Sequence, residues 1–177
     1  MKEMLIKAFD MACIAEQFEL TIREASELIN QVWENETNLI REDYRFNKKK
    51  WCLDFHYWSH YLYDKVTLDN EFPVVQREAV SSGNYLDEFD YCNDFQNFDF
   101  FFISMRIEIL YLGKRNYRRM KLRSLLSAYG YKRRTEKIVS YLKKCLDFYH
   151  IKIYLRSGIE CNIEDISLDD MITFRTI

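Results

Sequence analysis

The chain has 177 residues, of which 48% are hydrophobic and 31% charged, and its formal net charge is −2. This length and composition suit one globular domain, or two very small ones, built around an apolar core. No run of about 18 uncharged apolar residues occurs, which excludes a transmembrane helix of the usual kind and predicts no membrane partner.

The compartment follows from the chain start and the cysteines. The first seven residues hold two lysines and a glutamate, and they lack the apolar centre of a signal peptide. Five cysteines are widely spaced without a CxxC pair, which predicts reduced thiols. The sequence therefore predicts a cytoplasmic protein that uses no metal or other cofactor.

Two amphipathic helices are predicted at the start of the chain. Apolar residues recur at helical spacing over residues 3–18 and again from Ile22 to about Asn35. Between them, Thr21 and Glu24 have the spacing of a capping box, in which each side chain accepts a hydrogen bond from a free backbone N–H group.

This helical pair also has features of a helix-turn-helix motif. Ala15 and Leu28 lie where that motif places apolar residues, but Glu19 stands where its tight turn favours glycine. Glu24 and Glu27 on the second helix would repel phosphates. We therefore favour two packed helices over a base-reading unit.

Residues 39–66 are rich in aromatic side chains and predict a helix that is buried on most sides, with a strand as the alternative that the aromatic content allows. Cys52, His56, His60 and Asp64 recur at every fourth residue and form one stripe on such a helix. The stripe is too long to surround one ion, although His56 and His60 together would suit a metal or a hydrolase. The flanking tryptophans and tyrosines favour buried histidines instead.

An acidic aromatic stretch over residues 85–102 contains five acids and no cation. We interpret it as an acidic loop that leads into the core, where its phenylalanines pack. The alternative is a protein-docking surface of an inhibitor or anti-defence protein that imitates nucleic acid, with Asp87, Glu88 and Asp90 as partner contacts. After it, polar and apolar residues alternate from Ser104 to Leu110, which predicts a strand.

A basic block over residues 114–144 holds twelve lysines and arginines against one acid, Glu136. Its charge of +11 leaves −13 for the rest of the chain, so the near-neutral total conceals strong polarity. A concentrated cationic surface attracts polyanions by Coulomb attraction and counterion release. Pairing with the protein's own carboxylates is the competing interpretation.

Helices and strands are also predicted in and after this block. A short helix over residues 120–129 ends at Gly130, in the position that favours left-handed backbone. Thr135 can cap a longer helix that runs to about Tyr149. Alternation predicts strands over 151–155 and 171–177 that pair with each other.

The predicted fold class is α+β and predominantly helical. An acidic, mainly helical part over residues 1–113 precedes a basic helix–helix–β-hairpin unit over residues 114–177, with the boundary near Gly113. The two parts could also form one compact domain.

Residues 121–177 resemble a small winged-helix-like module of bacterial proteins associated with restriction and phage defence. The resemblance rests on the segment Lys121–Arg134, with its Leu-Leu-x-x-Tyr-Gly-x-x-Arg-Arg pattern, and on the Asp-rich turn before the final strand at Leu168–Phe174. It implies a role beside a defence or mobile-element system and implies no catalytic residue.

Non-catalytic binding of DNA, RNA or a nucleoprotein complex is the function that these features favour. No Walker loop, dinucleotide fingerprint, nucleophile elbow or HExxH motif occurs, and with four glycines a phosphate-cradling loop is hard to build. The candidate phosphate contacts act by charge, without reading bases. They are Arg118, Arg119, Arg123, Lys132, Arg133, Arg134 and Lys137.

Overall fold

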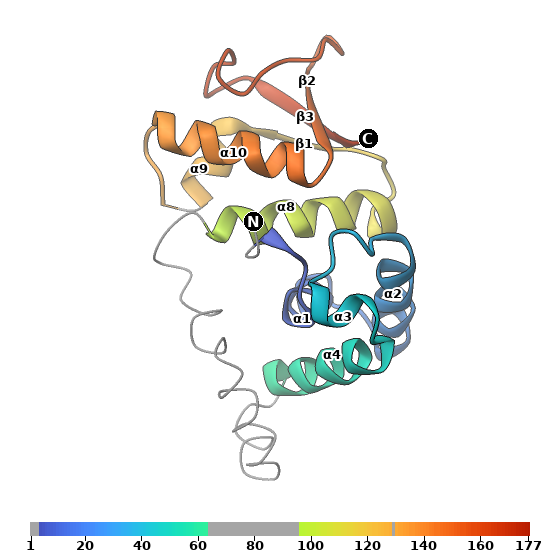
Figure 1. Ribbon diagram of the computed structural model, residues 1–177. Coiled ribbons are helices and arrows are strands. Elements are labelled where there is room, and N and C mark those ends of the chain that lie inside the picture. Colours follow the sequence, from blue (N-terminus) through green and yellow to red (C-terminus); the bar gives the residue numbers. More distant parts are fainter. Residues whose placement is uncertain (1–3, 64–95, 129) are drawn as a thin grey trace. The chain divides into compact units, whose positions relative to one another are not determined.

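The computed structural model describes residues 4–63, 96–128 and 130–177 (Figure 1). The chain divides into a first unit, residues 1–94, and a second unit, residues 95–177. Within the described residues, the first unit is helical, and the second combines helices with a three-stranded antiparallel sheet. The prediction of an α+β, mostly helical protein is confirmed. Gly113, the boundary that the charge pattern predicts, lies inside the second unit.

Within residues 4–63, the first unit contains four helices. They are α1 (Ala8–Gln17), α2 (Ile22–Asn35), α3 (Glu42–Arg45) and α4 (Lys48–Tyr63). The first helix begins later than predicted because Ile6 is extended and pairs in parallel with Ile40. The single helix predicted over residues 39–66 is instead two, α3 and α4.

Aromatic side chains form the centre of this unit. The Trp51 side chain is fully buried and donates from Nε1 to the carbonyl oxygen of Ile29 at 3.0 Å. Its ring meets that of Tyr44 edge-on at 5.3 Å, and Phe9 of α1 meets Trp58 of α4 in the same way at 5.1 Å. The spacing of Trp51 and Trp58 on α4 therefore places both rings against the other helices.

The predicted capping box at the start of α2 is confirmed. Thr21 Oγ1 accepts from the backbone N–H of Glu24 at 3.3 Å, and the Glu24 carboxylate accepts from the backbone N–H of Thr21 at 2.9 Å. The turn before it is strained, since Glu19 has φ +51°. Glycine adopts this left-handed region without the clash that a Cβ atom causes.

We expect Glu19→Gly to stabilise the protein by roughly 0.5–1 kcal/mol, because relief of the left-handed strain exceeds the extra entropy of an unfolded glycine. The measurement is the thermal unfolding midpoint. Glu16→Gly is the matched control: Glu16 is exposed in the last turn of α1, where its backbone is helical and glycine should cost up to about 1 kcal/mol. A lower midpoint for Glu19→Gly would contradict the strain at this turn.

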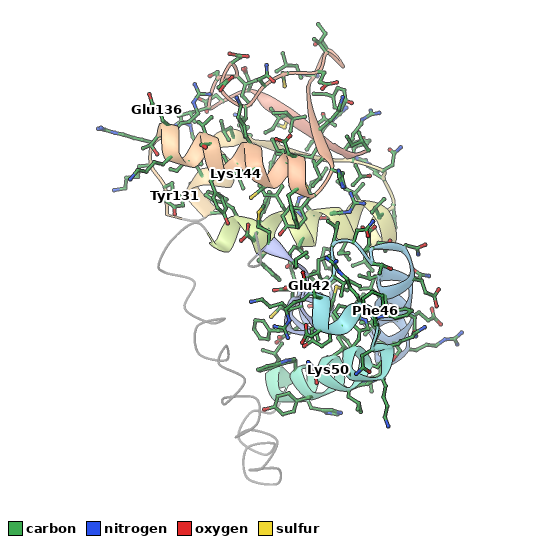
Figure 2. The ribbon with its side chains drawn as sticks, viewed as in Figure 1. Glu42, Phe46, Lys50, Tyr131, Glu136 and Lys144 are labelled. Carbon is green, nitrogen blue, oxygen red and sulfur yellow. The ribbon has the colours of Figure 1, made fainter. Side chains whose placement is uncertain are left out.

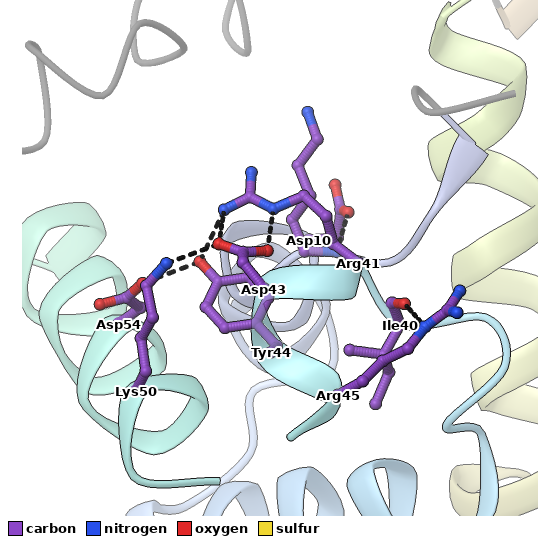
Figure 3. A network of polar contacts seen from close by, with 9 residues as sticks. Asp10, Ile40, Arg41, Asp43, Tyr44, Arg45, Lys50 and Asp54 are labelled. Carbon is purple, nitrogen blue, oxygen red and sulfur yellow. Dashed lines mark hydrogen bonds and ion pairs between the residues drawn. The ribbon is translucent and has the colours of Figure 1, made fainter. Parts of the chain in front are cut away.

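A polar network joins α3 to α4 (Figure 3). Arg41 donates to both oxygens of Asp43, at 2.7 and 2.9 Å, and Lys50 Nζ approaches the same carboxylate at 2.5 Å. The buried Tyr44 hydroxyl donates to Asp54 at 2.8 Å and accepts from Arg41 at 3.1 Å. Burial opposes ionisation of Asp43, but the hydrogen bonds from Arg41 and Lys50 outweigh it and lower its pKa to about 2.

We expect the network to lose stability in acid. Asp43 binds its proton more weakly in the folded state than in the unfolded state, whose carboxyl pKa is 3.8. Its contribution is therefore complete above about pH 5 and is lost as the pH falls through about 2. Because the side chain is 38% exposed, solvent screening limits that contribution to about 1 kcal/mol. Urea unfolding of wild type and Asp43→Asn from pH 6 to pH 2 should show a stability difference that shrinks in acid; a constant difference would refute this.

The second unit runs in the order helix, strand, two helices, two strands. Its elements are α8 (Gln96–Ile107), the π-helical turn η2 (Glu108–Leu112), β1 (Arg118–Lys121), α9 (Leu122–Ala128), α10 (Glu136–Phe148), β2 (Ile151–Leu155) and β3 (Met171–Thr176). The sheet order is β1-β3-β2. The predicted pairing of the last two strands is confirmed, whereas β1 was not predicted.

The strand predicted over residues 104–110 is wrong, because this segment completes α8 and forms η2. Two of the three polar residues in the alternation are themselves buried: Ser104 is 3% exposed and Arg106 is 9% exposed, while Glu108 is half-buried. Arg106 donates to the carbonyl oxygen of Tyr149 at 2.7 Å, just after α10 ends. A helix that is buried on all sides does not show the usual amphipathic period.

Stacked aromatic rings connect α8 to the sheet. Phe102 stacks on Tyr149 at a centroid distance of 6.5 Å and meets Phe174 of β3 at 6.3 Å. Phe174 pairs in register with Arg118 of β1 and Ile153 of β2, so this side of the sheet faces the core. The side chains of Arg119, Thr173 and Tyr154, one position along each strand, lie on the opposite, outer side.

Candidate nucleic-acid interface

The start of α10 is fixed by local signals that the sequence predicted. Gly130 has φ +79° after α9, and Thr135 Oγ1 accepts from the backbone N–H of Ile138 at 3.3 Å. Between them, the Tyr131 ring stacks on Phe98 of α8 at 5.4 Å. The turn from 130 to 135 is thus held at both ends and in its middle.

Four cations project from this turn and from α10: Lys132, Arg133, Lys137 and Lys144, which we call the α10 cluster. All four are exposed. None forms an ion pair with another residue in the part of the chain that the structure describes. Lys137 and Lys144 are seven residues apart and therefore share one face of the helix. Figure 2 labels Lys144 on α10. Glu136, in the first turn of α10, is the acid nearest to them in sequence.

Other candidate phosphate contacts are engaged within the protein. Arg118 lies on the core side of the sheet and pairs with Glu108 at 2.6 Å. Arg123 makes two hydrogen bonds to Asp169, each 2.8 Å long, and both side chains remain exposed. The hydrogen bonds to Asp169 raise the pKa of Arg123, and those from Arg123 lower the pKa of Asp169.

Arg134 holds the loop between β2 and β3, residues 156–170. Its Nη1 donates to the carbonyl oxygens of Ile163, at 3.1 Å, and Ile166, at 2.5 Å. The side chains of Ile163 and Ile166 are buried, at 1% and 3% exposure. The sequence places Arg134 among equivalent cations of a basic turn, and nothing in it separates this structural role from that of Arg133.

The β2–β3 loop is acidic, with five carboxylates and one arginine. Glu164 pairs with Lys143 at 2.6 Å, and Asp169 pairs with Arg123. Part of the basic block is therefore neutralised by the loop, while the α10 cluster is left without such pairing among the described residues.

Arg119 lies on the outer side of the sheet, where its Nε donates to Thr173 Oγ1 at 3.1 Å. Its guanidinium group also lies 4.8 Å from the ring centre of Tyr117. The sequence prediction missed Tyr117, Tyr154 and Arg175, which share this side. The missed signal is the alternation of Tyr117, Arg119 and Lys121, which has the period of a strand.

The histidine stripe does not lie in the core, which corrects that prediction. His56 and His60 are exposed on α4, because the buried Trp51, Phe55 and Trp58 occupy its inner face. Among the described residues, no three His, Cys, Asp or Glu side chains gather as metal ligands would. Asp64 lies outside those residues.

The pKa values of two described cysteines, Cys145 and Cys161, do not favour their use as nucleophiles. Burial raises the pKa of Cys145, and the neighbouring Asp99 carboxylate adds to that rise. Burial likewise raises the pKa of Cys161. An activated cysteine nucleophile needs a shift in the opposite direction.

The candidate partner contacts Asp87, Glu88 and Asp90 lie outside the described residues. The described end of the acidic aromatic stretch belongs to α8. Of the four phenylalanines predicted for the core, Phe98, Phe101 and Phe102 are buried, whereas Phe100 is only half-buried. Some carboxylates that are adjacent in sequence, such as Asp169 and Asp170, lie in turns. Asp170 stabilises one of them by accepting a hydrogen bond from the backbone N–H of Ser167 at 2.7 Å.

Comparison of the chain with protein-family models, curated proteins and solved structures found no match. None of the helices in the described ranges is both long and apolar enough to cross a membrane.

Proposed function

We propose that residues 114–177, within the second unit, form a winged-helix-like module and that the protein is a non-catalytic accessory protein that binds nucleic acid, alone or in a nucleoprotein complex. The α10 cluster carries the proposal. It would contact backbone phosphates by charge, without reading bases. A role beside a bacterial or phage defence system is the biological setting that the sequence resemblance favours.

The order of elements supports this assignment. A winged helix has a pair of helices joined by a turn, followed by a β-hairpin whose loop is the wing. Here α9 and α10 are the pair, β2 and β3 the hairpin, and residues 156–170 the wing. In such a module the second helix of the pair is the one presented to DNA.

The distribution of charge then favours one mode of contact. Lys132 and Arg133 lie in the turn before α10, where the free N–H groups of the first helical turn also favour anions. Lys137 and Lys144 continue the positive surface along the helix. The acidic wing would repel phosphates, so we place the nucleic acid along α10 and its preceding turn, away from the wing.

A gel-shift panel with the full chain tests this proposal. We expect retention of duplex DNA at low salt and a log–log salt slope of roughly −3 to −4, since about four cations would meet phosphates. The panel contains duplex DNA, single-stranded DNA and RNA, each at several salt concentrations. Absence of duplex retention at low salt, or retention that is insensitive to salt, would refute phosphate contact by the α10 cluster.

A further inference from the structure

The outer face of the sheet carries a cluster of arginines and tyrosines that the α10 cluster does not include. Tyr117 comes just before β1, Arg119 lies in β1, Tyr154 in β2 and Arg175 in β3. The register pairs Arg119 with Thr173 and Tyr154 with the same Thr173, which brings the three strands' outer side chains into one row.

Guanidinium groups and phenol rings alternate across this face. The Tyr117 ring centre lies 4.8 Å from Arg119 Cζ, 5.7 Å from Arg115 Cζ and 5.9 Å from Arg175 Cζ. Arg175 Cζ is also 5.7 Å from the ring centre of Tyr154. Arg175 therefore links the two rings, and all five residues form one continuous surface.

The charges of this surface are not balanced by carboxylates of the described residues. Arg115, Arg119 and Arg175 are exposed and form no ion pair with any described residue. The carboxylate at its edge, Glu160, is taken by Lys152 at 3.0 Å. The surface thus presents three uncompensated guanidinium groups around two half-exposed rings.

We propose that this outer sheet face binds single-stranded nucleic acid. Bases stack on the faces of Tyr117 and Tyr154 and on the arginine planes, and the arginines neutralise the phosphates between them. Flat aromatic and guanidinium groups on a sheet are what unpaired bases need, whereas the bases of a duplex are already stacked on each other. An acidic protein segment would match the charge but would gain little from the rings.

This inference does not rest on the α10 cluster, because the two surfaces share no residue and have different substrates. Different substitutions should therefore abolish binding at each of the two surfaces. A chain with both surfaces would hold a duplex on one and an unpaired strand on the other.

Fluorescence anisotropy of labelled 12-nucleotide oligo(dT) and oligo(U) with the full chain tests the proposal. We expect Tyr117→Ala and Tyr154→Ala each to weaken single-strand affinity about tenfold. Tyr117→Phe and Tyr154→Phe keep the stacking face and should retain wild-type affinity. Duplex binding through Arg133 and Lys137 should not change in any of these variants.

Three results would overturn the proposal. They are unchanged single-strand affinity in the alanine variants, loss of that affinity in Arg133→Glu/Lys137→Glu alone, and equal competition by oligo(dT) and by a poly-glutamate of the same charge. If the alanine variants lose the native circular dichroism spectrum, Arg115→Gln and Arg175→Gln replace them. Those exposed changes should weaken binding several-fold, and unchanged affinity would again refute the assignment.

Discussion

Reversing two charges of the α10 cluster, in Arg133→Glu/Lys137→Glu, is expected to lower duplex DNA affinity about 100-fold at low salt, equivalent to about 2.8 kcal/mol. Two phosphate contacts disappear, and two carboxylates then face the phosphates that remain. The salt slope should also become shallower by roughly 2, since two fewer counterions are released. Titration by gel shift at three salt concentrations measures both effects.

Two other variants make this result specific. Arg23→Glu/Lys49→Glu changes the net charge equally at exposed positions of the first unit and should leave duplex affinity nearly unchanged. Glu136→Gln removes the acid from the first turn of α10 and should tighten binding several-fold. Equal losses in both double reversals would mean that net charge, and not the α10 cluster, governs binding.

Arg134→Met is expected to destabilise the protein by about 2–3 kcal/mol, because two loop carbonyl groups lose a charged donor. Those carbonyls belong to Ile163 and Ile166, whose side chains are buried under the loop. Arg133→Met, one residue earlier, removes an exposed side chain with no hydrogen bond to another described residue and should change stability by less than about 0.5 kcal/mol. Urea unfolding of the two variants is the comparison.

The same pair separates stability from binding. Arg133→Met should weaken duplex binding while it unfolds like wild type. Arg134→Met should unfold earlier and become more susceptible to proteolysis between residues 156 and 170, with duplex binding retained while the unit is folded. Equal unfolding free energies for Arg134→Met and wild type would show that the loop does not depend on this arginine.

Local signals predicted much of the fold. The capping box at Thr21, the cap at Thr135 and the glycine at position 130 each act within a few residues, so the sequence alone specifies them. The errors lie in segments whose secondary structure depends on tertiary contacts. The segment from Ser104 to Leu110 is helical despite its alternating pattern, and two of its three polar residues, Ser104 and Arg106, are buried. The strand β1 is short and charged, and it forms by pairing with β3, fifty or more residues away.

The sequence predicted the positive charge of the candidate site but not which of its cations form ion pairs within the protein. Composition shows that residues 114–144 are basic, and it cannot show which cations have partners. Arg123 and Lys143 meet carboxylates from the loop, while Arg133 and Lys137 do not, and these differences arise from contacts across 20 to 50 residues. Arg119 joins Tyr154 and Arg175 through strand register, which the sequence left undefined because β1 was unrecognised.

The attachment of the β2–β3 loop by Arg134 has a geometric consequence. Adjacent residues of one turn have different roles in the proposed function: Arg133 would attract a polyanion, while Arg134 holds the carboxylate-rich loop that would repel it. The basic turn that carries Arg133 and the acidic β2–β3 loop therefore keep a fixed distance from each other within the second unit. A nucleic-acid strand lying along α10 would be repelled on the side of the β2–β3 loop. This repulsion would limit the length of the bound strand and the direction from which it approaches.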